Sequence, residues 1–298
     1  MERRPGAAVI ATIVFAVAAA NGCGDVNAAL QQLADARHLS SDLQVQFIKA
    51  ADASNRAVMA DTDPTSVAAA RDAEQAKQAV KKDLDALGPM LQSLHYEDES
   101  RILQDFVTRF AEYDAVDRRI LELAVENTNL KAQRLSFGAA QDAADAFRDA
   151  LEPIAGSTPA GDPCHVRALV ATAIAALRDI QVLQAPHIAT PDDAEMARLE
   201  KRMTSSETAT RAALQTLGRV VPAPSRPGIA AATAALNKFM DVHHEILTLS
   251  HRNTNVHSLA LSLSQKPAAT AACEDRLRAL QEELAKRGPK VARWPNGN

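Results

Sequence analysis

Histidine is the residue type in this chain best suited to binding chemistry, because a neutral imidazole binds metals and titrates near neutral pH. Six of the eight histidines lie in the second half of the sequence: His165, His187, His243, His244, His251 and His257. His244 and His251 share one face of a predicted helix, but about 10 Å of helix axis separates them, too far for one metal ion. No histidine pair is four residues apart, and no Glu-x-x-His or Cys-x-x-Cys-His motif occurs. The sequence therefore predicts no metal site and no cofactor.

The other residue types offer no recognisable catalytic arrangement. Acidic residues are abundant but scattered over faces that helical spacing turns toward solvent, so none is singled out for acid–base work. No glycine-rich phosphate loop and no Gly-x-Ser-x-Gly elbow occurs. We therefore expect no catalytic residues and a protein that is not an enzyme.

The charge balance argues against nucleic acid as a partner. The formal net charge of the 298 residues is −4, whereas a protein that neutralises phosphates needs clustered lysine and arginine. No basic run is interleaved with aromatic residues on which bases would stack, and aromatics make up only 3% of the chain. Nucleic-acid binding is thus not expected.

The first 22 residues have the plan of a bacterial secretory signal. Arg3 and Arg4 precede an uncharged apolar run at 7–20, which is short for a membrane span. Residues 20–23 resemble a lipobox, and we favour lipidation of Cys23, which would attach the chain to a membrane. Cleavage after Ala20 with plain secretion, and an uncleaved anchor, remain alternatives. All three predict an exported protein, periplasmic or lipid-anchored to the cell envelope.

An internal repeat organises the rest of the chain. Residues 116–151 align without a gap on residues 242–277, and 13 of the 36 positions are identical. Unrelated alanine-rich helices would share about three or four by composition alone. A tandem duplication follows, and repeats must be settled before other questions of fold.

Helical spacing of apolar residues runs through both copies, and no stretch alternates with a period of two. Gly138 is expected to let the chain reverse between a third and a fourth helix. We therefore predict an all-α protein with two tandem antiparallel four-helix bundles after an N-terminal signal segment at 1–23. The predicted parts are bundle 1 (24–155), a linker (156–163), bundle 2 (164–288) and a flexible tail (289–298).

Two asparagines recur at apolar seam positions of the third helix in each copy. Asn127 and Asn253 continue the spacing of buried valine, isoleucine and leucine, so both should face a core. A buried amide must find a hydrogen bond or cost about 1–3 kcal/mol. The favoured interpretation is a contact that fixes helix register, and the alternative is a polar contact in a ligand pocket.

The same residues carry a resemblance to a known family. Residues 119–132 (Arg-Ile-Leu-Glu-Leu-Ala-Val-Glu-Asn-Thr-Asn-Leu-Lys-Ala) and residues 245–256 resemble the third helix of the four-helix-bundle sensor domain of bacterial methyl-accepting chemotaxis receptors. Residues 268–284 are similar to its fourth helix. The resemblance covers both copies, although its motifs are mainly helical and apolar.

This resemblance implies a ligand-sensing domain, often a homodimer, that passes small helix displacements through a membrane. The sequence departs from the family because no second apolar span, linker domain or signalling hairpin occurs in it. In some members of the family, basic residues near the first helix hold a ligand carboxylate, which makes Arg56 and Arg178 candidates. The favoured interpretation of each is a solvated helix-face arginine.

Three functions therefore remain open from the sequence, of which a metal- or haem-binding bundle is the least favoured. The first is a sensor-like protein that binds a small molecule, alone or with a membrane signalling partner, outside the cytoplasm. The alternative is a structural or protein-interaction scaffold of the cell envelope without a small-molecule ligand. The two copies diverge outside their seams, which is compatible with one functional and one structural repeat.

Overall fold

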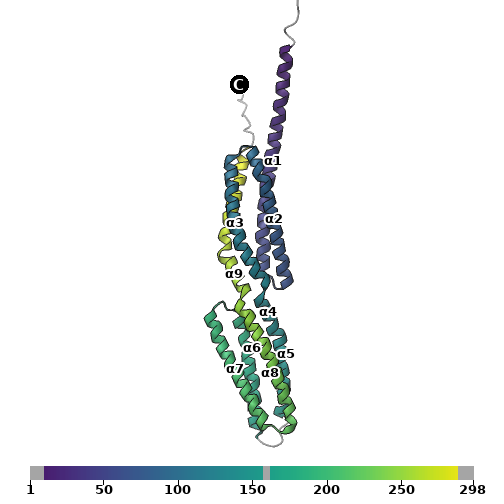
Figure 1. Cartoon of the computed structure of the whole chain (residues 1–298), viewed down its shortest axis with the longest axis vertical. Helices are drawn as coiled ribbons and strands as arrows, with labels where there is room; N and C mark the ends of the chain where they lie inside the picture. The colour runs from purple at the N-terminus through teal and green to yellow at the C-terminus, as the bar shows by residue number, and fades with distance from the viewer. Residues whose placement is uncertain (1–9, 157–161, 288–298) are drawn as a thin grey trace, which may run out of the picture. The chain divides into compact units, whose positions relative to one another are not determined.

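The computed structural model describes residues 10–156 and 162–287, with side chains from residue 27 onward. Residues 1–9 of the predicted signal segment, the Cys23 side chain, residues 157–161 of the predicted linker 156–163 and the tail 289–298 lie outside the described residues. All regular structure in the described part is helical, with no strand (Figure 1). The predicted all-α class is thereby confirmed.

The helices follow one another with short connections. They are α1 (Ile10–Val58), α2 (Asp63–Ser93), α3 (Glu97–Glu126), α4 (Thr128–Leu135), α5 (Gln141–Gly156), α6 (Pro163–Ala189), α7 (Asp193–Val220), α8 (Arg226–Arg252), α9 (Thr254–Ser264) and α10 (Lys266–Lys286). A π-helical turn, Ser136–Ala140, joins α4 to α5, and a 3-10 helix, Ala223–Ser225, precedes α8. None of the described helices combines the length and apolar character that crossing a membrane requires.

Local sequence explains where α6 and α7 begin. The Asp162 side chain accepts hydrogen bonds from the backbone amides of Cys164 and His165, with Pro163 at the first helical position. The Asp192 side chain does the same for the first amides of α7. An aspartate cap satisfies amides that have no partner inside the helix, so both starts are fixed by sequence.

The chain divides into two compact units, and neither is a continuous stretch. Unit 1 comprises 1–56, 68–118 and 262–298, and unit 2 comprises 57–67 and 119–261. This division differs from the predicted parts 24–155 and 164–288. The physical reason is that α10 packs its apolar face into the core formed by α1, α2 and α3, although it lies at the far end of the sequence.

Unit 1 has an aromatic core. The rings of Phe106 and Tyr113 from α3 meet Phe47 from α1 edge to face, with centroids 6.1 and 5.0 Å apart. Aliphatic residues complete this core, among them Leu43, Val80, Leu87, Leu277 and Leu280. Burying each such side chain contributes about 1.5–3 kcal/mol, which is what stabilises the unit.

Unit 2 has an aliphatic core with few rings. Its buried residues come from α5, α6, α7 and α8, and include Phe147, Leu177, Leu214, Leu236 and Ile246. Gly138 does not reverse the chain as the sequence suggested. Residues 136–140 form a π-helical turn, and the helix continues into α5 because the backbone hydrogen-bond ladder is widened rather than broken.

The two repeated Asn-Thr-Asn segments, 127–129 and 253–255, form one hydrogen-bonded joint inside unit 2. Asn127 and Asn253 adopt left-handed backbone angles, with φ of 53° and 49°, and end α3 and α8. Asparagine tolerates this conformation better than most residues. The predicted uninterrupted third helices are therefore broken at these positions.

The two Asn-Thr-Asn segments of the joint form reciprocal hydrogen bonds with each other. The Thr128 amide donates to Thr254 Oγ1, and the Thr254 amide donates to Thr128 Oγ1, both at 3.1 Å. The amides of Asn129 and Asn255 donate to each other's side-chain oxygens at 3.2 and 3.1 Å. A self-complementary contact of this kind is the pattern of a two-fold interface, here made within one chain.

The cysteines of the described residues form no disulfide. Cys164 is exposed and Cys273 is buried in the core of unit 1. Burial raises the pKa of the Cys273 thiol to about 12, so this cysteine stays a neutral packing group.

Candidate ligand site

Arg56 lies in a surface groove of unit 1 whose lining includes Asp52 and Asp72. Its guanidinium pairs with these two carboxylates at 3.2 and 3.3 Å, and its side chain is 55% exposed. The predicted candidate is thus already neutralised by acids of the same groove. An additional ligand carboxylate would have to displace them.

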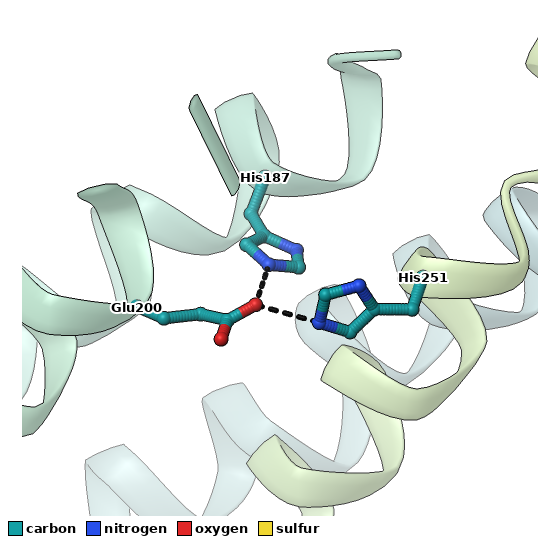
Figure 2. Close-up of side chains that lie close together, drawn as sticks. All are labelled: His187, Glu200 and His251. Atoms are coloured by element: carbon teal, nitrogen blue, oxygen red, sulfur yellow. Dashed lines mark hydrogen bonds and ion pairs between the residues drawn. The ribbon is translucent and has the colours of Figure 1, made fainter. Parts of the chain in front are cut away.

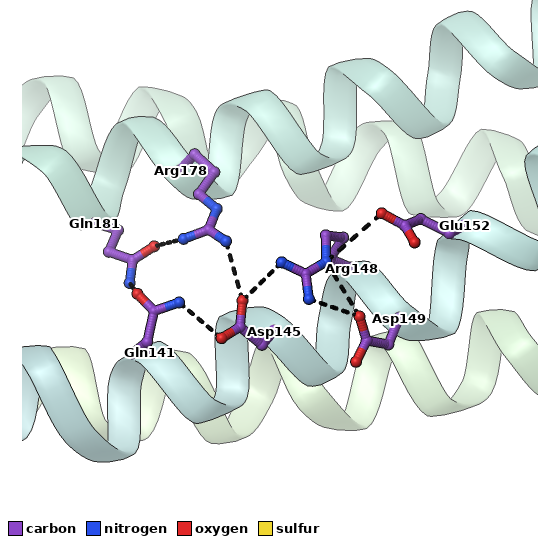
Figure 3. Close-up of polar contacts among 7 residues, drawn as sticks. All are labelled: Gln141, Asp145, Arg148, Asp149, Glu152, Arg178 and Gln181. Carbon is purple, nitrogen blue, oxygen red and sulfur yellow. Dashed lines mark hydrogen bonds and ion pairs between the residues drawn. The ribbon is translucent and has the colours of Figure 1, made fainter.

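Arg178 of α6 belongs to a polar ladder with α5 (Figure 3). Its guanidinium donates to Asp145 at 3.0 Å and to Gln181 at 2.7 Å. The hydrogen bond from Gln141 has the largest influence on Asp145 and, with Arg148 and Arg178, holds the pKa of that carboxyl below its usual value. The described hydrogen bonds of Arg178 go to the side chains of Gln181 and Asp145. This agrees with the interpretation of Arg178 as an arginine on a helix surface.

Asn127 and Asn253 lie in the Asn-Thr-Asn joint, and their side chains have protein partners. The Asn253 amide donates to the Thr190 carbonyl at 2.8 Å, and its oxygen accepts from Asn129 at 2.7 Å. The Asn127 oxygen accepts from Asn255 at 2.9 Å, while its buried amide nitrogen has no hydrogen-bond partner. The structure thus brings these two candidates together in one joint, and places neither beside Arg56 or Arg178 in the contacts that it describes.

A second group, absent from the predicted site residues, converges from three helices of unit 2 (Figure 2). Glu200 of α7 points between His187 of α6 and His251 of α8. One carboxylate oxygen, Glu200 Oε1, lies 2.8 Å from His187 Nε2 and 2.7 Å from His251 Nε2. The two imidazole rings meet edge to face with centroids 5.4 Å apart.

The members of this histidine–glutamate cluster differ in their exposure to solvent. The His187 side chain is fully buried, whereas Glu200 is 32% and His251 is 51% exposed. The cluster is therefore anchored on the protein side and open on the solvent side. A small ligand can reach it without unfolding the bundle.

The hydrogen bonds around His187 determine which nitrogen carries a proton. Ser250 Oγ donates its single proton to the His187 backbone carbonyl at 2.9 Å. The same Oγ lies 2.8 Å from His187 Nδ1, and when the hydroxyl proton is on the carbonyl, Nδ1 is the donor in that contact. In a neutral imidazole this leaves Nε2 as a bare lone pair that faces the Glu200 carboxylate. In this tautomer, a cation bound at His187 Nε2 would complete the contact with Glu200.

The electrostatics of Glu200 agree with this contact. Partial burial by itself raises the pKa of the Glu200 carboxyl, but hydrogen bonds and charge from His187 and His251 outweigh it and lower the pKa. Glu200 therefore stays ionised at neutral pH. An ionised carboxylate beside two imidazoles is a set of three good donors for one cation.

A buried polar chain lies next to the cluster, one helical turn along α6. Ser136 in the π-helical turn donates to Gln184 at 2.7 Å, and Gln184 Nε2 lies 3.3 Å from His243 Nδ1. Burial is the main cause, with the neighbouring His244 and His187, of a His243 pKa of about 4. His243 is thus a neutral histidine of the core. The Ser136 end of this row of polar residues lies in a π-helical turn, and such turns often occur at functional sites.

Ser250, His187 and Glu200 have the residue types of a hydrolase triad, but not its accessibility. Ser250 is fully buried and its proton is committed to the His187 carbonyl. A nucleophilic serine must reach a substrate, and this one cannot. Ser250 therefore orients His187 and does not act as a nucleophile.

The sequence missed the cluster because its members are 13 and 51 residues apart along the chain. Spacing along the sequence reveals only pairs on one helix, and the pair on one helix, His244 and His251, is too far apart for one ion. One signal was present: the repeat places Ala124 and Val125 opposite Ser250 and His251, so the second copy is polar where the first is apolar.

Comparison with known proteins gives no relative on which to base a function. No protein-family model matches the chain, and no curated protein is similar to it. The function is therefore argued from the site itself.

Proposed function

We propose that this chain is an exported, non-enzymatic, sensor-type binding protein with its ligand site at His187, Glu200 and His251. In this proposal a duplication produced two four-helix bundles, of which the second binds and the first supports it. Export rests on the N-terminal signal segment, with lipidation of Cys23 as the attachment to the envelope. A membrane signalling partner, or a homodimer, would carry the response onward.

One observation carries the proposal: His187 Nε2 faces an ionised carboxylate at 2.8 Å while Nδ1 is committed as a donor to Ser250. Core packing alone does not require such a contact, because an apolar residue would fill the space without a lone pair to neutralise. Buried polar groups without a hydrogen-bond partner or a counter-charge are typical of ligand-binding sites.

The test is a thermal-shift screen of the full chain against carboxylates, amino acids, aromatic acids and divalent metals. A ligand at 100 times its Kd is expected to raise Tm by about 5–10 °C. His251→Val, which installs the residue of the first repeat at this position, should abolish the shift. His257→Ala is the matched control, an exposed histidine on the neighbouring helix α9.

Two further variants separate this proposal from the sequence-derived candidates. Arg56→Ala and Arg178→Ala should keep the shift, because both arginines are paired with acids outside the cluster. A ligand whose effect survives His251→Val but disappears with Arg56→Ala would move the site to unit 1. A screen without any shift would contradict the binding function.

The alternative, an interaction scaffold, is favoured by one surface. A groove of about 300 Å³ on unit 2 is lined mostly by apolar residues, including Phe137, which is 69% exposed. Val182, three residues before the lining residue Ala185 on α6, is 70% exposed. Exposed apolar side chains beside a groove are typical of protein contacts. A partner protein that co-purifies with the wild type and is lost with Phe137→Ser would support this alternative.

A further inference from the structure

We propose that the histidine–glutamate cluster binds a divalent transition-metal cation of the zinc class, through His187 Nε2, His251 Nε2 and Glu200 Oε1. The inference rests on the proposed function and names the class of its ligand. The three donor atoms all lie within 4.8 Å of one another, and each comes from a different helix.

The arrangement favours a metal cation, rather than a proton, between His187 Nε2 and the Glu200 carboxylate. A proton on His187 would need only Glu200 as its partner. Here a second imidazole nitrogen, His251 Nε2, lies 2.7 Å from the same carboxylate oxygen. Three donors around one point suit a cation that accepts several lone pairs, and a three-ligand zinc site keeps its fourth position for water.

The surroundings of His187 supply the support that a metal-binding histidine needs. Such a histidine donates its other ring proton to a nearby acceptor, which fixes its tautomer and orientation. His187 Nδ1 donates to Ser250 Oγ at 2.8 Å, and Ser250 is itself held by the His187 carbonyl at 2.9 Å. The buried imidazole is thus held with Nε2 aimed at the other two donors.

Binding requires only small movements of the exposed members. Donor atoms about 2.0–2.1 Å from a tetrahedral ion lie about 3.3–3.4 Å apart, so each nitrogen must separate from Glu200 Oε1 by about 0.6 Å. Glu200 and His251 are partly exposed and their side chains can rotate. His187 can stay in place.

The donor set also determines which cations fit. Two imidazoles and one carboxylate suit zinc, cobalt, nickel and copper, whereas magnesium and calcium require mostly oxygen donors. One carboxylate and two neutral imidazoles give a divalent ion partial charge balance. Mg²⁺ is therefore the matched negative control for Zn²⁺.

The experiment uses the full chain without a histidine tag. Zn²⁺ at 100 times its Kd should raise Tm by about 5–10 °C, and Mg²⁺ should not. Co²⁺ should give the visible absorption of a tetrahedral site. Glu200→Gln and His251→Val, both at partly exposed positions, should abolish both signals, and His257→Ala should leave them unchanged. Ser250→Ala should weaken binding by about 10–100-fold, since it removes the group that orients His187.

The outcomes separate this inference from the proposed function. Equal Zn²⁺ shifts in His251→Val and in His257→Ala would overturn the metal site, as would a Zn²⁺ shift matched by Mg²⁺. An organic ligand whose shift depends on His251, without any metal response, would overturn the metal inference and leave the proposed function intact. His187→Gln should also abolish both signals, and should this buried substitution prevent folding, Glu200→Gln and His251→Val still decide the question.

Discussion

Each unit contains a cluster of ionisable groups with at least one fully buried member, and the two clusters differ in how their charges balance. In unit 1, Lys77 and Lys266 face Asp114 and Asp117, and all four side chains are at least 88% buried. Lys77 Nζ lies 2.8 Å from Asp114 and 3.1 Å from Asp117, and Lys266 Nζ lies 3.4 Å from Asp117. Two cations thus meet two carboxylates.

The protonation states in unit 1 follow from this pairing. Burial opposes the charge on Lys77, but Asp114, Glu74 and Asp117 outweigh it and raise the pKa of Lys77. Burial likewise opposes ionisation of Asp114, and Lys77 and its neighbours outweigh it and lower the pKa of Asp114. Burial is the main cause of a lowered pKa of Lys266, whose ammonium lies beside Asp117, so each buried charge of the cluster has a counter-charge.

The histidine–glutamate cluster of unit 2 is not balanced in this way. Its one carboxylate faces two imidazoles, and the buried one has its ring proton committed on the other side. The comparison teaches that burial of ionisable groups does not by itself mark a binding site. A binding site is distinguished by buried groups whose charge or hydrogen bonds are not balanced by other residues of the protein.

The largest expected effect is in unit 1. Asp117→Asn should destabilise the protein by about 3–5 kcal/mol, because the buried Lys266 would lose the carboxylate that it pairs with and Lys77 would lose one of its partners. Urea unfolding measures the change. Asp105→Asn is the control, since Asp105 is on the same helix and 64% exposed. A loss below 1 kcal/mol would show that the cluster is not the closed ion network described here.

A second balanced pair in unit 1 makes stability depend on pH. Burial raises the pKa of Glu99, but hydrogen bonds from Arg287 and the backbone outweigh it, so the pKa lies below its usual value. The stabilisation from this pair is therefore fully present above about pH 4.3, the pKa of a glutamate in the unfolded chain. It is lost as the pH falls through the lower pKa of Glu99 in the folded protein.

Glu99→Gln should cost about 1.5–3 kcal/mol at pH 7, and the difference from wild type should shrink as the pH falls below about 4. Unfolding midpoints at pH 7 and pH 3 measure it. Glu97→Gln, an exposed acid of the same turn, should show neither effect. A difference that is constant with pH would rule out the ionised pair as its origin.

The joint of unit 2 allows a comparison between the two repeats. Asn253→Ala removes two hydrogen bonds, to Thr190 and Asn129, whereas Asn127→Ala removes the one from Asn255. Both substitutions also lose the tolerance of asparagine for a left-handed backbone. Asn253→Ala should therefore destabilise the protein by about 1 kcal/mol more than Asn127→Ala. Equal losses would indicate that the backbone conformation, rather than the side-chain contacts, dominates.

The smallest expected effect sharpens the difference between the clusters. Glu200→Gln without metal should change stability by less than about 1 kcal/mol, because Glu200 is partly exposed and a glutamine amide can donate to His187 Nε2. Glu195→Gln, at another α7 acid, is the matched control. A loss near that of Asp117→Asn would make the unit 2 cluster a second closed ion network.

Sequence reasoning recovered the helical character of the protein well. Helix formation depends on neighbouring residues, so the spacing of apolar residues predicts helical segments. It erred at Gly138 and in continuing the third helices through Asn127 and Asn253, whose predicted burial is confirmed. A single widened turn and a single left-handed residue leave the apolar spacing almost unchanged, so periodicity cannot detect them.

The candidate site was beyond sequence reasoning for a different reason. Arg56, Arg178, Asn127 and Asn253 were chosen by type and by resemblance, and the structure pairs each of them with neighbouring residues. His187 and His251 were dismissed because spacing on a single helix describes only donors on that helix. A site built between helices depends on which helices pack together.

The sequence alone determined the all-helical class, because helix formation depends on short-range spacing and composition, and it contains the internal repeat of residues 116–151 and 242–277. Only the tertiary structure decided that α10 belongs to the core of unit 1, and that His187, Glu200 and His251 meet. Both outcomes come from the packing of amphipathic faces. Many pairings of such faces bury similar apolar area, and the choice among them rests on side-chain shape and polar contacts across the whole bundle.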